Sequence, residues 1–183
     1  MPSRNVRALN PPSLAWPDEE DAASDSLEAN HYYISDVRLA RWDDVAAVIA
    51  RENEVLPSLD VAEDAEAEWE KHSERIAAEA DGVADDFFTS LDPGIASAAL
   101  ALGAAGCIPF WSCNGGAFGG DHSSASPVVK FFAKPAHVDL LAAAADKSGA
   151  VLEQDECGRC AVTADNVGIM QEFARAMREA SGD

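Results

Sequence analysis

The residues with the clearest chemical potential lie together in residues 112–122, which read SCNGGAFGGDH and follow a predicted strand. Cys113 lies at the end of that strand, and His122 comes nine residues later. A thiol beside the backbone N–H groups of a glycine turn is well placed to act as a nucleophile with an oxyanion site. His122 could then serve as the base, oriented by Asp121 or Asp139. One hypothesis is therefore a thiol-dependent hydrolase or transferase.

The loop after Cys113 is rich in glycine, which permits backbone conformations that other residues avoid and lets a ligand approach the main chain. Gly115 and Gly120 have the spacing of a phosphate-binding P-loop, but Asp121 and His122 occupy the positions of its lysine and hydroxyl residue. A plain structural alternative stays open, in which Cys113 is a small buried side chain and the glycines form a connection. The candidate ligand-binding residues are Ser112, Asn114, Gly115, Gly116, Gly119 and Gly120.

A C-x-x-C pair, Cys157 and Cys160, offers two possible zinc ligands. Zinc needs two more ligands, which Cys107 and Cys113 could supply, or Cys113 together with His122. The alternative is a tight hairpin with free thiols and no metal. The sequence therefore requires no cofactor, and zinc is the one that it leaves open.

The charge is strongly negative, with 33 Asp and Glu against 13 Lys and Arg and a net charge of −20. This balance opposes binding to nucleic acid or to anionic membranes, which requires basic residues. The acidity is concentrated in residues 51–92, which hold 14 acidic and 3 basic residues. A soluble binding protein without a complete catalytic motif, such as an inhibitor or an immunity-type protein, is the leading hypothesis. Its partner would present a basic surface to Glu63, Glu66 and Glu70, and whether the protein is an enzyme stays open.

The lack of an export signal predicts a cytoplasmic location. Residues 1–30 contain four prolines and an acidic run but no apolar core of a signal peptide. Residues 93–120 carry no charge, yet their alanine and glycine content and Pro109 favour a buried helix and strand over a membrane span. The four cysteines are accordingly expected to be reduced.

Helical periodicity dominates the first half of the chain, after a loose acidic extension over residues 1–30. Aromatic and β-branched residues predict a strand over 31–38. An apolar stripe predicts a helix over 42–56, which Pro57 is expected to end. The further predictions are a helix beginning near Asp60 with capping-box spacing to Glu63, and a short apolar helix around 87–91.

Cap, proline and turn residues mark the ends of strands and helices more clearly in the second half of the chain. The predicted order is a helix begun by Asp92-Pro93, a strand over 107–113 with Pro109 at an edge or irregular position, a strand over 127–133, a helix over 135–149, strands over 150–156 and 161–164 joined by a two-residue turn, and a helix capped by Asp165. We expect one α+β domain over 31–183, in which helices cover mainly one face of a small mixed sheet. Its acidic helical part spans 42–92, and its β-rich part with the glycine loop spans 107–164.

Overall fold

A four-stranded sheet forms one side of the computed structural model, which describes residues 9–17, 37–79, 83–119 and 122–182. The strands are β1 (Ile108–Cys113), β2 (Val128–Phe132), β3 (Val151–Gln154) and β4 (Cys160–Thr163), in the spatial order β1-β2-β4-β3. Six α-helices complete a single domain, so the α+β prediction is confirmed. The sheet is antiparallel at every pairing rather than mixed, because no helical crossover joins neighbouring strands in parallel.

Strand β1 lies at the edge of the sheet and is irregular, as predicted from its proline. Pro109 pairs with Phe131, whereas Trp111 pairs with Lys130, so Phe110 is an extra residue and β1 carries a bulge. Proline lacks the N–H group that an inner strand must donate, and bulges concentrate at such edges. The bulge lies before Cys113, which ends the strand beside Val128 of β2.

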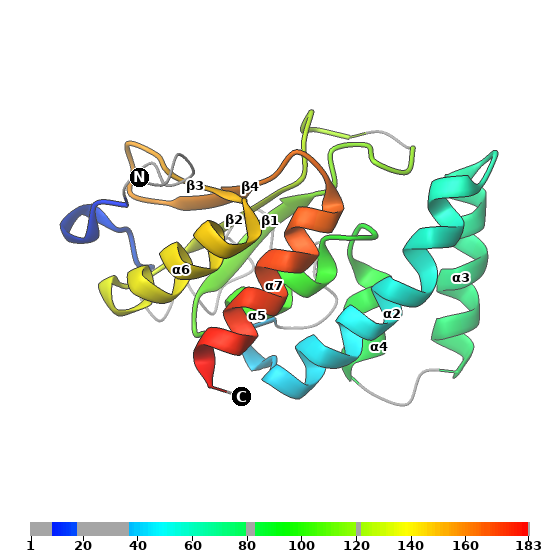
Figure 1. Cartoon of the computed structure of the whole chain (residues 1–183), viewed down its shortest axis with the longest axis horizontal. Coiled ribbons are helices and arrows are strands. Elements are labelled where there is room, and N and C mark those ends of the chain that lie inside the picture. Colours follow the sequence, from blue (N-terminus) through cyan, green and yellow to red (C-terminus); the bar gives the residue numbers. More distant parts are fainter. Residues whose placement is uncertain (1–8, 18–36, 80–82, 120–121, 183) are drawn as a thin grey trace.

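Three helices cover one face of the sheet (Figure 1): α5 (Ala96–Ala104), α6 (Val138–Ser148) and α7 (Val167–Ser181). Helices α5 and α6 contact the strands, and α7 packs on both helices. Residues 96–103 of α5 are all buried. This burial explains the uncharged segment as a core helix followed by an edge strand.

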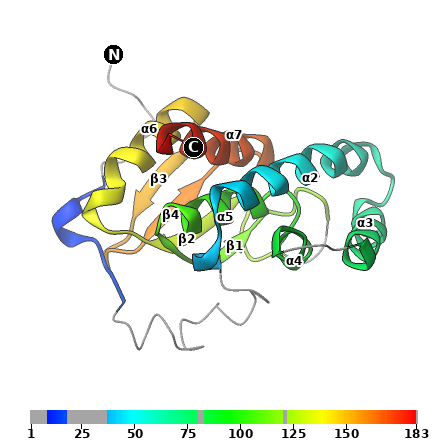
Figure 2. The ribbon, with the colours of Figure 1, turned by 90° about the horizontal axis from the view of Figure 1, so that it is seen from below.

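The acidic helices α2 (Trp42–Val61), α3 (Ala65–Glu79) and α4 (Val83–Ser90) extend beyond the sheet, on the other side of α5 (Figures 1 and 2). Helix α2 continues through Pro57, so the prediction that this proline ends the helix is wrong. Leu59, beyond the proline, is buried, and this burial offsets the lost backbone hydrogen bond. Because α2 extends to Val61, α3 begins at Ala65 rather than near Asp60.

The predicted first strand is not seen in the described residues. Residues 31–36 lie outside them, and Val37–Leu39 forms a 3₁₀ turn, η3. This turn crosses α5 so closely that a Cβ on Gly103 would lie 2.0 Å from the Val37 carbonyl oxygen. Contact with a buried helix has replaced strand pairing for this part of the segment.

Residues 9–17 of the predicted loose extension lie against the domain. The Ala15 N–H donates to the Gly158 carbonyl at 2.8 Å, and the Asn10 N–H donates to the Gln154 side chain at 2.7 Å. Trp16 contacts Lys134, whose ammonium lies 4.1 Å from a ring centroid. These contacts attach the segment to the β3–β4 hairpin and to the connection after β2.

Two details of the last elements differ from the prediction. Helix α6 follows a 3₁₀ turn, η4 (Pro135–His137), and α7 is capped by Asn166 rather than Asp165. The Asn166 side-chain oxygen accepts the Ile169 N–H at 3.1 Å. Across the described residues, no helix has both the length and the apolar character that a membrane span requires.

Candidate functional site

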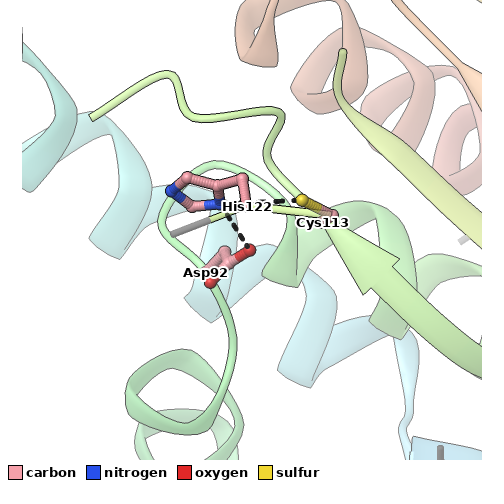
Figure 3. Close-up of side chains that lie close together, drawn as sticks. All are labelled: Asp92, Cys113 and His122. Carbon is pink, nitrogen blue, oxygen red and sulfur yellow. Dashed lines mark hydrogen bonds and ion pairs between the residues drawn. The ribbon is translucent and has the colours of Figure 1, made fainter. Parts of the chain in front are cut away.

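Cys113, at the carboxyl end of β1, faces a histidine and a carboxylate (Figure 3). Its Sγ lies 3.6 Å from Nδ1 of His122. The same nitrogen lies 3.9 Å from Oδ2 of Asp92. The structure therefore brings together the predicted thiol and the predicted base, and adds a carboxylate that the sequence did not single out.

Asp92 is held in this position by the loop after the strand. It lies in the turn between α4 and α5, where its carbonyl accepts the Ile95 N–H. Its Oδ2 accepts the Asn114 N–H at 3.1 Å, and the Asn114 side-chain amide donates to the Pro93 carbonyl at 3.4 Å. Asn114, predicted as a ligand-binding residue, is buried and links the α4–α5 turn to the end of β1.

Two glycines return the loop toward the thiol. Gly115 has a φ of +72°, and a Cβ there would lie 2.5 Å from the carbonyl carbon of Ser126. Gly116 has a φ of +78°, and a Cβ there would lie 3.3 Å from Cδ2 of His122. Glycine is the residue that tolerates both the left-handed backbone and the close approach. This tight turn is what brings His122 back over Cys113.

The N–H groups of the turn donate to acceptors that lie close to them in the sequence. The Gly115 N–H donates to Cys113 Sγ at 3.4 Å, and the Gly116 N–H donates to the Asn114 side-chain oxygen at 3.0 Å. The Gly119 N–H donates to the Gly116 carbonyl. The sequence suggested that these glycines cradle an anion, but three of their N–H groups already have acceptors inside the loop.

The orientation of His122 fixes the role of each ring nitrogen. Nε2 faces the Gly119 carbonyl oxygen, which can only accept, so Nε2 carries a proton. Nδ1 is left to face Cys113 Sγ and Asp92 Oδ2. A neutral His122 can take the thiol proton at Nδ1, and the imidazolium that forms lies beside a carboxylate.

These contacts shift both pKa values in the direction that favours proton transfer. Burial acts to raise the pKa of the Cys113 thiol, but hydrogen bonds from the Gly115 backbone, the His122 ring and the Ser124 backbone outweigh it and lower the pKa. The Gly119 carbonyl raises the pKa of His122, with smaller contributions from Cys113 and Asp92. The site therefore stabilises a thiolate beside an imidazolium.

A pocket of about 220 Å³ opens beside this pair. Its lining residues come from α3, from the α4–α5 turn and from the glycine loop: Glu66, Trp69, Asp92, Pro93, Asn114, Phe118, Gly119 and His122. Cys113 is 3 % exposed and is not itself part of the lining, whereas its neighbours His122 and Asn114 are. A molecule in the pocket would contact His122, whose Nδ1 lies 3.6 Å from the thiol sulfur.

The other predicted catalytic and binding residues have different outcomes. Gly120 and Asp121 lie outside the described residues. Asp139 is exposed on α6 and does not belong to the cluster around His122. Strand alternation places Ser112 on the face opposite Cys113. Asp92 was missed because an Asp-Pro pair before a helix is a common start signal and does not indicate a distant contact.

Of the C-x-x-C pair, Cys157 lies in the turn between β3 and β4, and Cys160 is the first residue of β4. Asp155 organises this turn by accepting the N–H groups of Cys157 and Arg159, both at 2.9 Å. The connection spans residues 155–159 and is longer than the predicted two residues. Cys157 is exposed, whereas Cys160 is buried and burial raises its pKa to about 11. Neither belongs to a cluster of three possible metal ligands among the described residues.

One cluster in the described part of the chain could hold a metal ion, and it is the site itself. The ligand atoms of Asp92, Cys113 and His122 lie within 4.8 Å of one another. Carboxylate, thiolate and imidazole are all ligands that zinc accepts. Metal binding is therefore the competing use of these side chains.

A buried carboxyl group outside the site, Glu52 on α2, has a structural explanation. Its two oxygens accept the Ser97 N–H of α5 and the Gln171 side-chain amide of α7, each at 3.1 Å. Burial raises its pKa. Glu52 thus links three helices of the core.

The three residues predicted to meet a basic partner, Glu63, Glu66 and Glu70, are all exposed. Glu66 and Glu70 lie on α3, and Glu63 lies just before it. Glu66 also lines the pocket, so the acidic surface reaches the thiol site.

Comparison with known proteins does not assign a function to this site. No family model, curated protein or solved structure matches the chain. The function must therefore be argued from the geometry of the site.

Proposed function

We propose that the protein is a thiol-dependent acyl-transfer enzyme, a hydrolase or a transferase, with Cys113 as nucleophile and His122 as base. The observation that carries the proposal is the contact between Sγ and Nδ1, with Nε2 held by the Gly119 carbonyl. A thiol, a base and a group that orients the base form the arrangement used in nucleophilic catalysis.

The proposed reaction has two steps. The Cys113 proton moves to Nδ1 of His122, and the thiolate attacks the acyl carbon of the substrate. The bond to the leaving group breaks, the leaving group takes the proton from His122, and a thioester remains on Cys113. Water, or another nucleophile in a transferase, then gives its proton to His122 and attacks the thioester, and the thiol regains that proton when the acyl group leaves.

Asp92 supports this cycle without touching the reacting atoms. Its carboxylate stabilises the imidazolium that exists while His122 holds the proton. Its hydrogen bond with Asn114 also keeps the end of β1 in place. We therefore assign Asp92 a positioning and electrostatic role.

The cellular setting follows from the chemistry. All four cysteines are free, and a reducing compartment protects a thiolate from oxidation, so we propose a cytoplasmic location. We also propose that the acidic residues of α3 attract basic molecules to this site. They would then serve the enzyme rather than form a separate inhibitor surface.

An acyl-transfer burst tests the proposal. The protein is mixed with p-nitrophenyl acetate in a Cys157→Ser background, because Cys157 is exposed and would react by itself. We expect a burst of nitrophenol equal to the protein concentration and one acetyl group on Cys113 by mass spectrometry. Cys113→Ala should abolish the burst, and Cys107→Ala, at the other end of β1, should retain it.

Two results would overturn the proposal. The first is acetylation that is unchanged in the Cys113→Ala variant. The second is one bound metal ion per chain in native mass spectrometry, with the reaction lost on chelation, which would make the same three side chains a metal centre. A burst that survives chelation supports the thiol mechanism.

A further inference from the structure

The pocket beside Cys113 combines acidic and aromatic groups. Two carboxylates, Glu66 and Asp92, and two aromatic side chains, Trp69 and Phe118, are part of its lining. Its volume of about 220 Å³ is below the ~300–1,000 Å³ of sites for whole drug-sized molecules. The pocket is therefore of a size to hold one side chain or one small group of a substrate.

The charge around the pocket is not balanced by the protein. On α3, Lys71 pairs with Glu68, and Arg75 pairs with Glu54 and Glu79. No ion pair joins Glu66 to a basic residue among the described residues, and none of the residues lining the pocket is lysine or arginine. His122, which faces Cys113 and Asp92, is the one lining residue that could carry a positive charge, and it does so only when it is protonated.

Glu66 and Trp69 lie on the same side of α3, because residues three apart share a helix face. A Cβ on Gly119 would lie 3.9 Å from Cβ of Glu66, so the helix lies directly against the glycine loop. Trp69 is held edge-on to Phe88, with ring centroids 5.2 Å apart. A fixed tryptophan beside a carboxylate attracts cations through both its ring and the neighbouring charge.

We propose that this pocket binds a positively charged group of the substrate, an ammonium or a guanidinium close to the acyl carbon that Cys113 attacks. This inference rests on the proposed function and names its substrate class: basic peptides or acyl compounds with a cationic side chain. Glu66 would pair with the cation, and Trp69 would contact it. An anionic substrate is disfavoured because the N–H groups of Gly115, Gly116 and Gly119 already have acceptors within the loop.

Charged thiol reagents test the inference without requiring the natural substrate. Methanethiosulfonates carry a trimethylammonium, a methyl or a sulfonate group on the same reactive centre. The Cys113 thiolate attacks the sulfenyl sulfur, a mixed disulfide forms, and methanesulfinate leaves. Rates are measured in the Cys157→Ser background and divided by the rates with glutathione, which removes differences in reagent reactivity.

The neutral reagent reports on the thiol alone, so it separates the two proposals. If Cys113 reacts with it no faster than glutathione does, the proposed function fails. If the neutral reagent reacts fast but the cationic and anionic reagents react equally, only the substrate class fails. We expect the cationic reagent to react faster than the anionic one, with a difference that shrinks as salt is added.

A matched pair of variants separates the pocket from the overall charge. Glu66→Gln removes a carboxylate that lines the pocket, and Glu74→Gln removes one on the same helix, eight residues or roughly 12 Å along its axis. We expect Glu66→Gln to reduce the cation-to-anion rate ratio by up to about fivefold, the upper end of the range for an exposed charge pair. Glu74→Gln should leave the ratio nearly unchanged. Equal effects of the two variants would overturn the pocket assignment and leave only long-range attraction.

Discussion

Two cysteine–histidine pairs lie at opposite ends of β1, and they share a similar distance and a similar burial of the thiol but differ in their other neighbours. Cys107, just before the strand, has its Sγ 3.4 Å from Nδ1 of His137. Cys113, at the end of the strand, has its Sγ 3.6 Å from Nδ1 of His122. Both cysteines are buried, with exposed fractions of 1 % and 3 %. Proximity and burial alone would predict the same chemistry at both.

The neighbouring groups shift the pKa values of the two pairs in opposite directions. Burial raises the pKa of the Cys107 thiol to about 12, with a contribution from Cys160. Burial also lowers the pKa of His137, and Lys134 adds to that effect. The Lys134 N–H donates to the His137 nitrogen that faces the thiol, at 3.1 Å, so that nitrogen is poorly placed to take a proton. This pair stays neutral.

The Cys113 pair has the opposite set of neighbours. A backbone N–H points at the sulfur, a carbonyl holds Nε2, and a carboxylate faces Nδ1. Each of these contacts favours the charged form of the group that it touches. The comparison teaches that a thiol–imidazole contact alone does not fix the pKa of a cysteine: the groups that surround the contact decide whether the pKa is raised or lowered.

The largest expected difference is in alkylation rate. At pH 7, a thiol with the Cys107 pKa of about 12 carries roughly one thiolate in 10⁵ molecules. Cys113, with a pKa below that of an ordinary thiol, should react with iodoacetamide at least about a thousandfold faster. Peptide mapping by mass spectrometry measures both rates in one sample. Similar alkylation rates of Cys107 and Cys113 in the native protein would contradict the difference between the two pairs. As a control, the two cysteines should react at similar rates after denaturation.

A smaller effect is expected from removing each histidine. His122→Ala removes a hydrogen bond that lowers the Cys113 pKa, so the pH midpoint of Cys113 alkylation should move to higher pH. At pH 7 the rate should fall, by less than the difference between Cys113 and Cys107. His137→Ala should leave the Cys113 profile unchanged. If the pH dependence of Cys113 alkylation is the same in the His122→Ala variant, His122 does not act as the base.

The smallest effect, with the opposite sign, is expected at the carboxylate. Asp92 raises the pKa of both Cys113 and His122, so Asp92→Asn should move both midpoints to lower pH. Asparagine can still accept the Asn114 N–H, so the loop should keep its place. We expect a change in the neutral-pH alkylation rate of no more than about threefold. The His122 midpoint is measured by NMR titration, and Asp155→Asn, in the β3–β4 turn, is the control. A shift to higher pH would contradict the electrostatic role of Asp92.

Much of this architecture could be predicted from local patterns. The strand before Cys113, the glycine turn and the return of His122 are all confirmed, because a turn of nine residues constrains its own ends. The apolar stripes located most helices, and Pro109 indicated an irregular edge strand. The errors occurred where packing overrides local preference: Pro57 lies inside α2 because Leu59 is buried beyond it, and the end of the predicted first strand is a 3₁₀ turn against α5.

The contacts that distinguish the two cysteines lie outside any local pattern. Asp92 precedes Cys113 by 21 residues and reaches it only because α5, between them, packs against β1. His137 follows β2 in the chain, 30 residues after Cys107, and no local pattern predicts that these two residues meet. A periodic pattern predicts which face of an element is buried, but not which polar groups meet across two loops.

The sequence by itself placed Cys113 and the glycine turn in or next to the uncharged segment and most of the negative charge on the helices before it. These properties depend on composition and short spacing, which folding does not alter. Only the tertiary structure decided that Asp92 would face His122, that Cys107 would stay neutral and that Glu66 would reach the same pocket. Each of these depends on loops brought together by helix and sheet packing, and the free energy of a proton or a cation depends on such neighbours within a few ångströms.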